Sequence, residues 1–297
     1  MPSLRSNFGD LLAPGFREIF FEKFKSYPDE YPKICNLPAT AKRQYQDDSS
    51  ISGFGAAAEK TESIGISYDD PIQGYDKRYT HVTYGLGFRV SREMYEDDLY
   101  GKMNKMPKAL ARSIRYTLET SIANIYNRAF NTSYTGGDGK ELCALDHPLT
   151  GGGTEQNELT NAADLYETTL EQALIDIAAT TDDRGLVLAL RPKLLLVTPS
   201  NNVNAHKLLK STQEPGSANN ADNFFQGIMP YTVNHYLTDT DAFFILCEDH
   251  EVNCFMRRKP DFEQDNDFDT EDAKFKVTAR WSEGWSIPWG VFGSPGI

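Results

Sequence analysis

The chain has 297 residues, of which 39% are hydrophobic and 25% charged, so it can form a sizeable core in two packed lobes and general disorder is not expected. Its formal net charge of −13 repels phosphate backbones, which argues against sequence-specific binding of nucleic acid. The sequence contains no run of 18 apolar residues and no basic start followed by an apolar block. We therefore expect neither a membrane span nor a secretory signal, and a protein that is made and used in a cytoplasm.

Residues 1–50 are predicted to form an N-terminal arm. One short amphipathic helix places four apolar side chains on one face, namely Phe16, Ile19, Phe20 and Phe24. The prolines after it prevent regular structure from continuing, and they are Pro28, Pro32 and Pro38. Because a segment with an apolar stripe and little core of its own must pack on something else, Phe16 and Phe20 are candidate assembly-interface residues.

The next segment, residues 51–92, is predicted to form a long two-stranded hairpin. Apolar and polar side chains alternate from Thr80 to Val90, which is typical of a half-buried strand, and we expect it to pair with the stretch before Asp69. Turn residues around Pro71 and Gly74 place the tip between Asp69 and Arg78. An isolated hairpin is marginal in water, so we expect this one to lie on a neighbouring subunit. The charged residues at its tip complete the interface candidates: Asp69, Asp70, Asp76, Lys77 and Arg78.

Residues 93–150 contain the clearest helix of the chain. Pro107 falls in its first turn, where the missing N–H costs little. Apolar residues then follow at spacings of three and four: Leu110, Ile114, Leu118, Ile122, Ile125 and Ala129. We expect one continuous helix over 104–131, about 40 Å long at 1.5 Å per residue. Ile114 and Ile122 should face the core.

The second half of the chain predicts an α/β lobe followed by strands. A glycine-rich loop over 143–162 precedes a helix at 164–180, an apolar strand at 193–199 and a helix near 203–209. Residues 215–223 are polar and predict a surface loop. Strands are predicted at 228–237, 243–248, 252–257 and 274–282, and the chain ends in an aromatic tail with Trp281, Trp285 and Trp289.

Signatures of catalysis are missing from the sequence. It has no nucleophile elbow, no phosphate-binding loop and no dinucleotide fingerprint. Cys247, His250 and Cys254 form the most metal-like cluster, but their place at a predicted turn between strands favours ordinary hairpin cysteines. Cys143 and His147 lie in the glycine-rich loop, where His147 is better explained as a loop anchor than as a base.

Two further features favour structural roles. The seven acidic residues of 261–272 begin like a calcium loop, but Thr270 and Lys276 replace the glycine and glutamate that such a loop needs, so we expect a solvated loop between strands. The four cysteines are too sparse for a disulfide scaffold and are expected to be reduced and mostly buried. We therefore assign no catalytic residue, no cofactor-binding residue, no metal site and no cofactor.

Several short sequence segments, taken in order, resemble those of a known family. They are Gly85–Met94 followed by Asp97 and Asp98, Leu145–Leu149 before a glycine-rich stretch, Thr181–Gly185 followed by Arg191–Leu194, and Arg280–Trp281 through Gly293–Gly296. From about residue 50 onward they resemble the major capsid (head) protein of tailed double-stranded-DNA bacteriophages, of the Mu-like prophage head-subunit type. Encapsulins and the floor domain of herpesvirus capsids share its fold.

The resemblance implies an α+β fold, the tailed-phage major capsid fold. Its parts would be the arm (1–50), an extended hairpin loop (51–92), a peripheral domain with a long spine helix (93–150), an α/β axial domain (151–240) and a β-rich return to the peripheral domain (241–297).

The same resemblance implies a function in assembly rather than catalysis. The chain would form pentamers and hexamers of an icosahedral shell in the virion, assembled in the host cytoplasm around packaged DNA without sequence-specific binding and without a membrane. Many relatives carry a removable N-terminal scaffolding region, so a separate scaffolding protein or an already trimmed chain is implied, besides a portal and a possible decoration protein. Lys60 and Lys77 lie in the extended loop, but neither has a sequence context that assigns a covalent crosslink. Two alternatives remain, an encapsulin-like nanocompartment shell and a soluble α/β enzyme with an unrecognised site.

Overall fold

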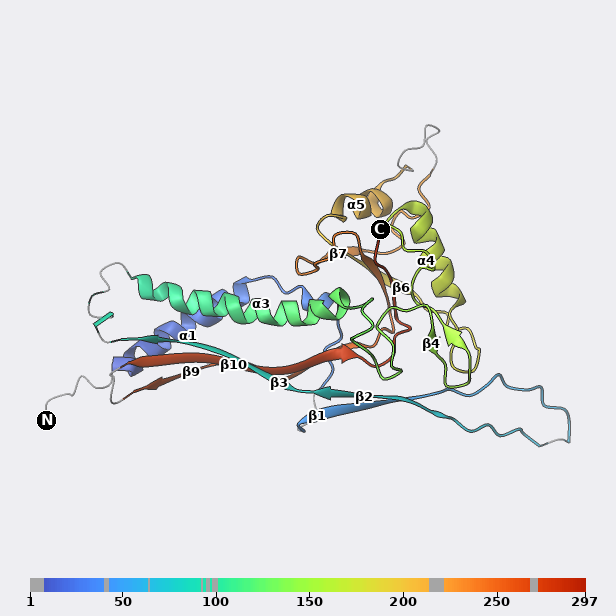
Figure 1. The fold of residues 1–297 in the computed structure, drawn as a ribbon, viewed down its shortest axis with the longest axis horizontal. Coiled ribbons are helices and arrows are strands. Elements are labelled where there is room, and N and C mark those ends of the chain that lie inside the picture. The colour runs from blue at the N-terminus through green and yellow to red at the C-terminus, as the bar shows by residue number, and fades with distance from the viewer. Residues whose placement is uncertain are drawn as a thin grey trace.

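The computed structural model describes residues 8–39, 43–63, 65–91, 93–94, 97, 101–213, 222–267 and 272–297, and they form two hydrophobic cores. The first core lies in an elongated lobe. It is enclosed between two helices and a sheet of three antiparallel strands in the order β3–β10–β9 (Figure 1). These strands are β3 (Val82–Val90), β9 (Val252–Asn266) and β10 (Ala273–Trp285). Along β10, Phe275 and Val277 are buried while Lys274 and Lys276 are exposed, as expected for a sheet covered on one face.

Two helices, α1 (Phe8–Ser26) and α3 (Lys105–Asn127), cover the inner face of this sheet (Figure 1). The prediction that α3 is one continuous helix with Ile114 and Ile122 in the core is confirmed. A short 3-10 helix, η3 (Lys102–Asn104), precedes α3. The helix ends before residue 131 because the chain turns at Arg128, whose N–H bonds back to Asn124 and Tyr126.

A second sheet, in the order β11–β8–β6–β7, forms the other lobe together with α4 (Glu167–Ala179) and α5 (Asn202–Lys210). Its strands are β6 (Pro192–Val197), β7 (Tyr231–Val233), β8 (Phe243–Cys247) and β11 (Val291–Ser294). β6 and β7 are parallel and joined through α5, which is the α/β arrangement predicted from the sequence. Leu195 packs into the core with α4 and α5, whereas Leu196 packs into the core of the first lobe. The central strands therefore separate the two cores.

The C-terminal segment does not all return to the first lobe. β8 and β11 belong to the second sheet, and only β9 and β10 belong to the first, so the expectation for residues 241–297 is corrected. Pairing explains the difference, because β8 lies beside β6 and β11 adds to its other edge.

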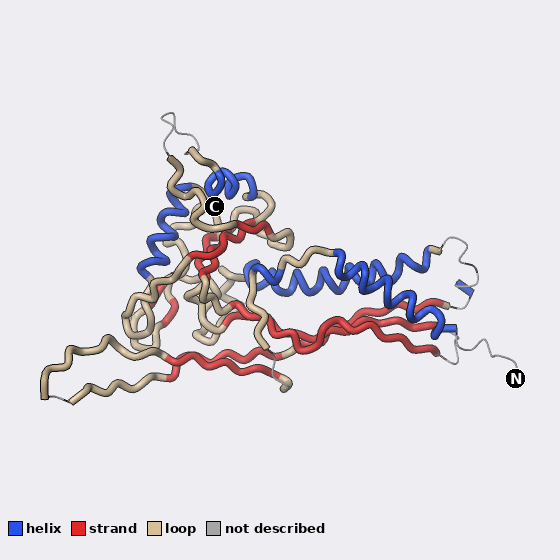
Figure 2. The backbone as a smooth tube through the Cα atoms, turned by 180° about the vertical axis from the view of Figure 1, so that it is seen from behind, coloured by secondary structure: helices blue, strands red, loops and turns tan. Residues whose placement is uncertain are grey.

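The predicted hairpin is also corrected. β1 (Tyr45–Ile51) pairs with β2 (Gln73–Thr80) in a separate two-stranded ribbon. The strand predicted from Thr80 to Val90 is interrupted at His81, and its main part, β3, pairs with β10 instead. The ribbon lies alongside the body, and the loop that it carries, residues 52–63 and 65–72, projects past the second lobe, as both views show (Figures 1 and 2).

The acidic run differs from its prediction in the same way. Residues 261–266 continue β9, because their carboxylates pair across the strands, as Glu263 does with Lys276 at 2.9 Å.

A short 3-10 helix, η2 (Tyr31–Lys33), and a two-residue pair, β4 (His147–Pro148) with β5 (Thr154–Glu155), complete the described elements. Most of the predicted polar loop at 215–223 lies outside the described residues. Within those described, no helix has the length and apolar character needed to cross a membrane.

Candidate assembly surfaces

The ribbon is fastened to the body at its base. Tyr79 of β2 is buried, its ring lies 4.9 Å from that of Phe255, and its hydroxyl is 2.6 Å from Ser286 Oγ. Lys77 donates to the carbonyl oxygen of Thr135 at 2.8 Å and lies over the Trp285 ring. Burial lowers the pKa of Lys77, which marks this cation as partly withdrawn from water. The base of the ribbon is thus part of its own subunit.

At the same level of the ribbon, an exposed ion pair joins its two strands. Arg78 donates to both carboxylate oxygens of Asp47, at 2.6 and 3.1 Å, and its guanidinium lies 4.1 Å from the centre of the Tyr45 ring. The pairing with Asp47 raises the pKa of Arg78. Asp76, on the same strand, accepts a weak bond from Gln73 at 3.3 Å. These contacts fix the register of the ribbon rather than its position on the body.

A second clamp holds the far end of the ribbon. The carboxylate of Asp69 accepts the Gly55 N–H at 2.8 Å, which closes the loop across its width. Arg184 donates to the carbonyl oxygen of Asp70 at 2.6 Å and lies 3.6 Å from Asp69. The Gly55 N–H and the Arg184 charge lower the pKa of Asp69. Arg184 belongs to the turn after α4, so the second lobe helps to aim the loop.

The loop itself exposes large apolar side chains. Tyr68 is 94% exposed and Ile51 is 71% exposed, which is unusual for residues of this kind. The others that are exposed on the same segment are Phe54, Ile66 and Ile72. A segment with this composition and without a core of its own presents a surface that favours contact with another molecule.

Three of the five charged interface candidates from the sequence, Asp76, Lys77 and Arg78, therefore lie in β2, and the other two, Asp69 and Asp70, lie in the loop before it. Phe16 and Phe20 do not lie on a surface: they are 3% and 0% exposed and pack in the first core, where Phe16 contacts Phe275 with ring centres 5.1 Å apart. The apolar stripe of α1 is covered by its own subunit. We therefore withdraw these two phenylalanines as contacts to a neighbour, while the role of the charged five stays a prediction.

Two buried charges that the sequence analysis missed hold the arm against α3. The Arg115 guanidinium pairs with Asp29, donates to the carbonyl oxygen of Phe24 at 3.0 Å and lies over the Phe24 ring. One turn later, Glu119 accepts the N–H groups of Glu30 and Tyr31 at 3.1 and 2.9 Å. Burial raises the pKa of Glu119 to about 7, against the opposing effect of these N–H groups and of Arg115. A charge pair at i and i+4 on the apolar face of the predicted helix was the available signal.

His147 is an anchor of the joint between the lobes. Its Nδ1 is 2.6 Å from Asp138 and its Nε2 is 3.1 Å from the side-chain oxygen of Asn157. Asn157 in turn donates to the carbonyl oxygens of Leu142, Pro288 and Val291. His147 is completely buried and both of its ring nitrogens have partners, so neither is free to act as a base on a substrate, which agrees with its interpretation as a loop anchor.

The cysteines are all free and buried. Burial raises the pKa of Cys143 and, to about 12, the pKa of Cys247, so neither is an activated thiol. Cys254 lies against Cys35 of the arm. Within the described residues, no group of three or more His, Cys, Asp or Glu side chains is arranged to hold a metal ion.

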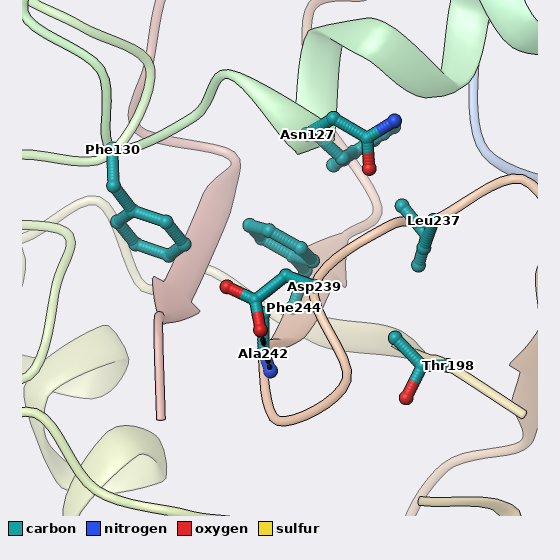
Figure 3. Close-up of a pocket in the computed structure, with 8 residues that line it drawn as sticks. Asn127, Phe130, Thr198, Leu237, Asp239, Ala242 and Phe244 are labelled. Atoms are coloured by element: carbon teal, nitrogen blue, oxygen red, sulfur yellow. Dashed lines mark hydrogen bonds between the residues drawn. The ribbon is translucent and has the colours of Figure 1, made fainter. Parts of the chain in front are cut away.

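Cavities are small or open. Figure 3 shows one of about 20 Å³, at the junction of α3 with the second sheet and lined by Tyr126, Phe130, Phe244 and their neighbours. It has room for about one water molecule. A larger one of about 300 Å³ lies where the ribbon passes into its loop, between Ile51, Tyr75 and Trp289. Its carboxylates are engaged, since Asp183 accepts the Thr150 N–H and Asp182 accepts those of Arg184 and Leu186.

Comparisons with known proteins agree with this arrangement of two lobes, the long helix α3 and a projecting loop. A family model described as phage capsid protein matches residues 74–286. No curated protein matches the chain.

Solved structures show the same fold at low identity. They include the capsid of bacteriophage JBD30, with a TM-score of 0.56, 14% identity, and coverage of 72% of this chain and 92% of that chain. The mature capsid of bacteriophage PhiM1 matches with a TM-score of 0.58, 9% identity, and coverage of 90% and 87%. A virus-like particle from Pyrococcus furiosus matches with a TM-score of 0.55, 12% identity, and coverage of 94% and 97%. Since the family model covers more than half of the residues, the chain belongs to the phage capsid protein family and is a structural shell subunit with the tailed-phage capsid fold.

Proposed function

We propose that the chain forms the shell of an icosahedral bacteriophage head, in pentamers and hexamers of itself that enclose double-stranded DNA. The observation that carries this proposal is the projecting loop, because its apolar side chains have no cover within the described chain while its base is rigidly attached. A second copy of the subunit is the partner that a symmetric assembly supplies. The family match does not favour a nanocompartment shell or a soluble enzyme.

The remaining partners follow from this function. Assembly would take place in the host cytoplasm, with a separate scaffolding protein, a portal and a possible decoration protein. The enclosed DNA would be held without sequence-specific contacts, since the net charge of −13 disfavours tight binding of phosphates. No catalytic step is part of this function.

Replacing residues 56–68 by a short Gly-Ser linker tests the loop. This leaves the Asp69–Arg184 clamp, the Gly55 N–H and both strands of the ribbon in place. We expect a folded subunit by circular dichroism that no longer forms shells by sedimentation and electron microscopy. Ile66→Ser combined with Tyr68→Ser should weaken assembly in the same direction, whereas Lys60→Ser, a polar change in the same loop, should not. Intact shells from the linker variant would refute the proposed role of the loop.

A further inference from the structure

Cys35 and Cys254 come from distant parts of the chain and meet in the first core. Cys35 follows η2 in the arm, and Cys254 lies near the start of β9. The Cys35 thiol donates to the carbonyl oxygen of Tyr31 at 3.1 Å. Cys35 and Cys254 are buried in the same core, and their two chain segments lie side by side.

The backbone around the pair is fixed from both sides. Asn36 forms a parallel bridge with Asn253, in which the Asn36 N–H donates to Val252 at 2.8 Å and the Cys254 N–H donates to Asn36 at 2.9 Å. The Tyr126 hydroxyl holds the carbonyl oxygen of Ile34, next to Cys35. Because both segments are anchored within one residue of each cysteine, the fold itself holds these two buried cysteines in neighbouring positions.

The other two cysteines have no such arrangement. Cys143 and Cys247 are equally buried, and the groups that act on them are carboxylates, those of Glu158 and Glu141 for Cys143 and that of Asp249 for Cys247. Among the four free thiols, Cys35 and Cys254 are the pair whose segments are bridged, and Cys143 and Cys247 serve as internal controls.

We propose that Cys35 and Cys254 are a latent disulfide, which closes when the protein meets a low-molecular-weight disulfide such as oxidised glutathione. The thiolate of one cysteine attacks the small disulfide, forms a mixed disulfide and releases one small thiol. The thiolate of the other cysteine then attacks the protein sulfur of that mixed bond and releases the second small thiol. The protein loses two electrons and two protons, and the reagent gains them as two thiols.

The rate and the direction of this reaction follow from the surroundings. The neighbouring Cys254 thiol and burial hold the pKa of Cys35 above its ordinary value, so the reaction is slow in the closed structure. The cover over Cys35 is thin, because Lys33, Asn36 and Leu37 beside it are exposed, and local opening of this short segment admits the reagent. The bond would tie the arm to β9 across the whole central part of the chain, and long rings stabilise most by limiting the unfolded state.

The disulfide would form when the protein leaves the reducing cytoplasm, and this statement rests on the proposed function. A shell subunit folds in a reducing cytoplasm and then persists outside the cell, where disulfides are stable. The bond would make this attachment of the arm to β9 covalent after assembly. The chemistry of the pair does not depend on assembly.

The test uses the complete chain, once as purified subunits and once as sedimented particles. Each is treated with oxidised glutathione under native conditions, and free thiols are then alkylated after unfolding. We expect a mass loss of about 2 Da before alkylation, a fall from four to two alkylated cysteines, and a non-reducing peptide map that joins Cys35 to Cys254. The oxidised protein should unfold at a higher denaturant concentration, and dithiothreitol should reverse the change.

Matched variants complete the test. Cys35→Ser and Cys254→Ser should each abolish the mass loss, whereas Cys143→Ser should retain it. Four alkylated cysteines after oxidation, a stable glutathione adduct, or a bond to Cys143 or Cys247 in the wild-type map would overturn the proposal without any need for the variants. If the subunits close the bond but form no shells, the proposed function fails and the disulfide assignment stands.

Discussion

Ile122→Asp is a severe change to the first core. Ile122 is fully buried in the second half of α3, next to Ser121, whose hydroxyl accepts the Trp281 indole N–H at 2.9 Å. Loss of the side chain alone is comparable to truncations that cost about 2–5 kcal/mol. An unpaired carboxylate in the same place adds several kcal/mol more. Since domains of this kind have only about 5–15 kcal/mol of stability in total, we expect the subunit not to fold.

Three variants of α3 make the experiment quantitative. Ile122→Asp should yield no soluble protein. Ile122→Val should lower the free energy of unfolding by about 0.5–1.5 kcal/mol. Ser113→Asp should leave the free energy of unfolding near the wild-type value. Ser113 is the matched control because it lies exposed on the same helix. The assays are the soluble fraction and urea denaturation followed by circular dichroism. If Ile122→Asp and Ser113→Asp unfold at the same urea concentration, the packing of α3 as described here is refuted.

Two further substitutions test single contacts. Glu119→Gln should abolish a pH dependence: the folded-state pKa of about 7 lies above the ordinary 4.5, so this carboxyl favours the folded state most below pH 4.5 and loses that contribution as the pH rises to 7. The stability of wild type relative to Glu119→Gln should therefore fall by up to about 3 kcal/mol over that range, and a constant difference in urea midpoints would contradict the assignment. Gly87→Ala should destabilise the first sheet by about 1–3 kcal/mol, because the new Cβ would lie 2.6 Å from the carbonyl oxygen of Phe275. Gly85→Ala would place its Cβ 3.3 Å from the Thr278 methyl group and 3.6 Å from the carbonyl oxygen of Val277, so it should cost less. Both variants are measured by thermal unfolding, and equal losses would argue against this register.

Local periodicity predicted the elements, but it could not predict their partners. The spacing of three and four in α3 depends only on nearby residues, so both the helix and its buried face were correct. The alternation from Thr80 to Val90 states that one face of a strand is buried and says nothing about which strand lies beside it. Its true partner, β10, lies near the other end of the sequence. The turn residues around Pro71 and Gly74, just before the strand, favoured the wrong pairing.

Composition was an equally incomplete guide to burial. The apolar stripe with Phe16 and Phe20 predicted that α1 packs on something, and the structure shows that this is its own sheet. The acidic run after Asp261 looked solvated because its lysine partners lie on another strand. The charge pair of Arg115 and Glu119 on the apolar face of α3 could have indicated buried charges. The partners of Glu119 in the arm could not be predicted, since backbone N–H groups leave no trace in the side-chain pattern.

The candidate site owes its character to a contrast between its two ends. At the base of the ribbon, Tyr79 and Lys77 bind the body through packing and hydrogen bonds, so the direction of the loop is set before any partner arrives. At the far end, Tyr68 and its apolar neighbours face water. Each such side chain, if fully buried by a neighbour, gains about 1.5–3 kcal/mol, and part of that gain is lost to the ordering of the loop. A single contact of this kind is therefore weak. A closed shell repeats it around every subunit at high effective concentration, so modest contacts suffice once their geometry is fixed in advance. The rigid base of the ribbon is consequently as important for assembly as the apolar loop that it carries.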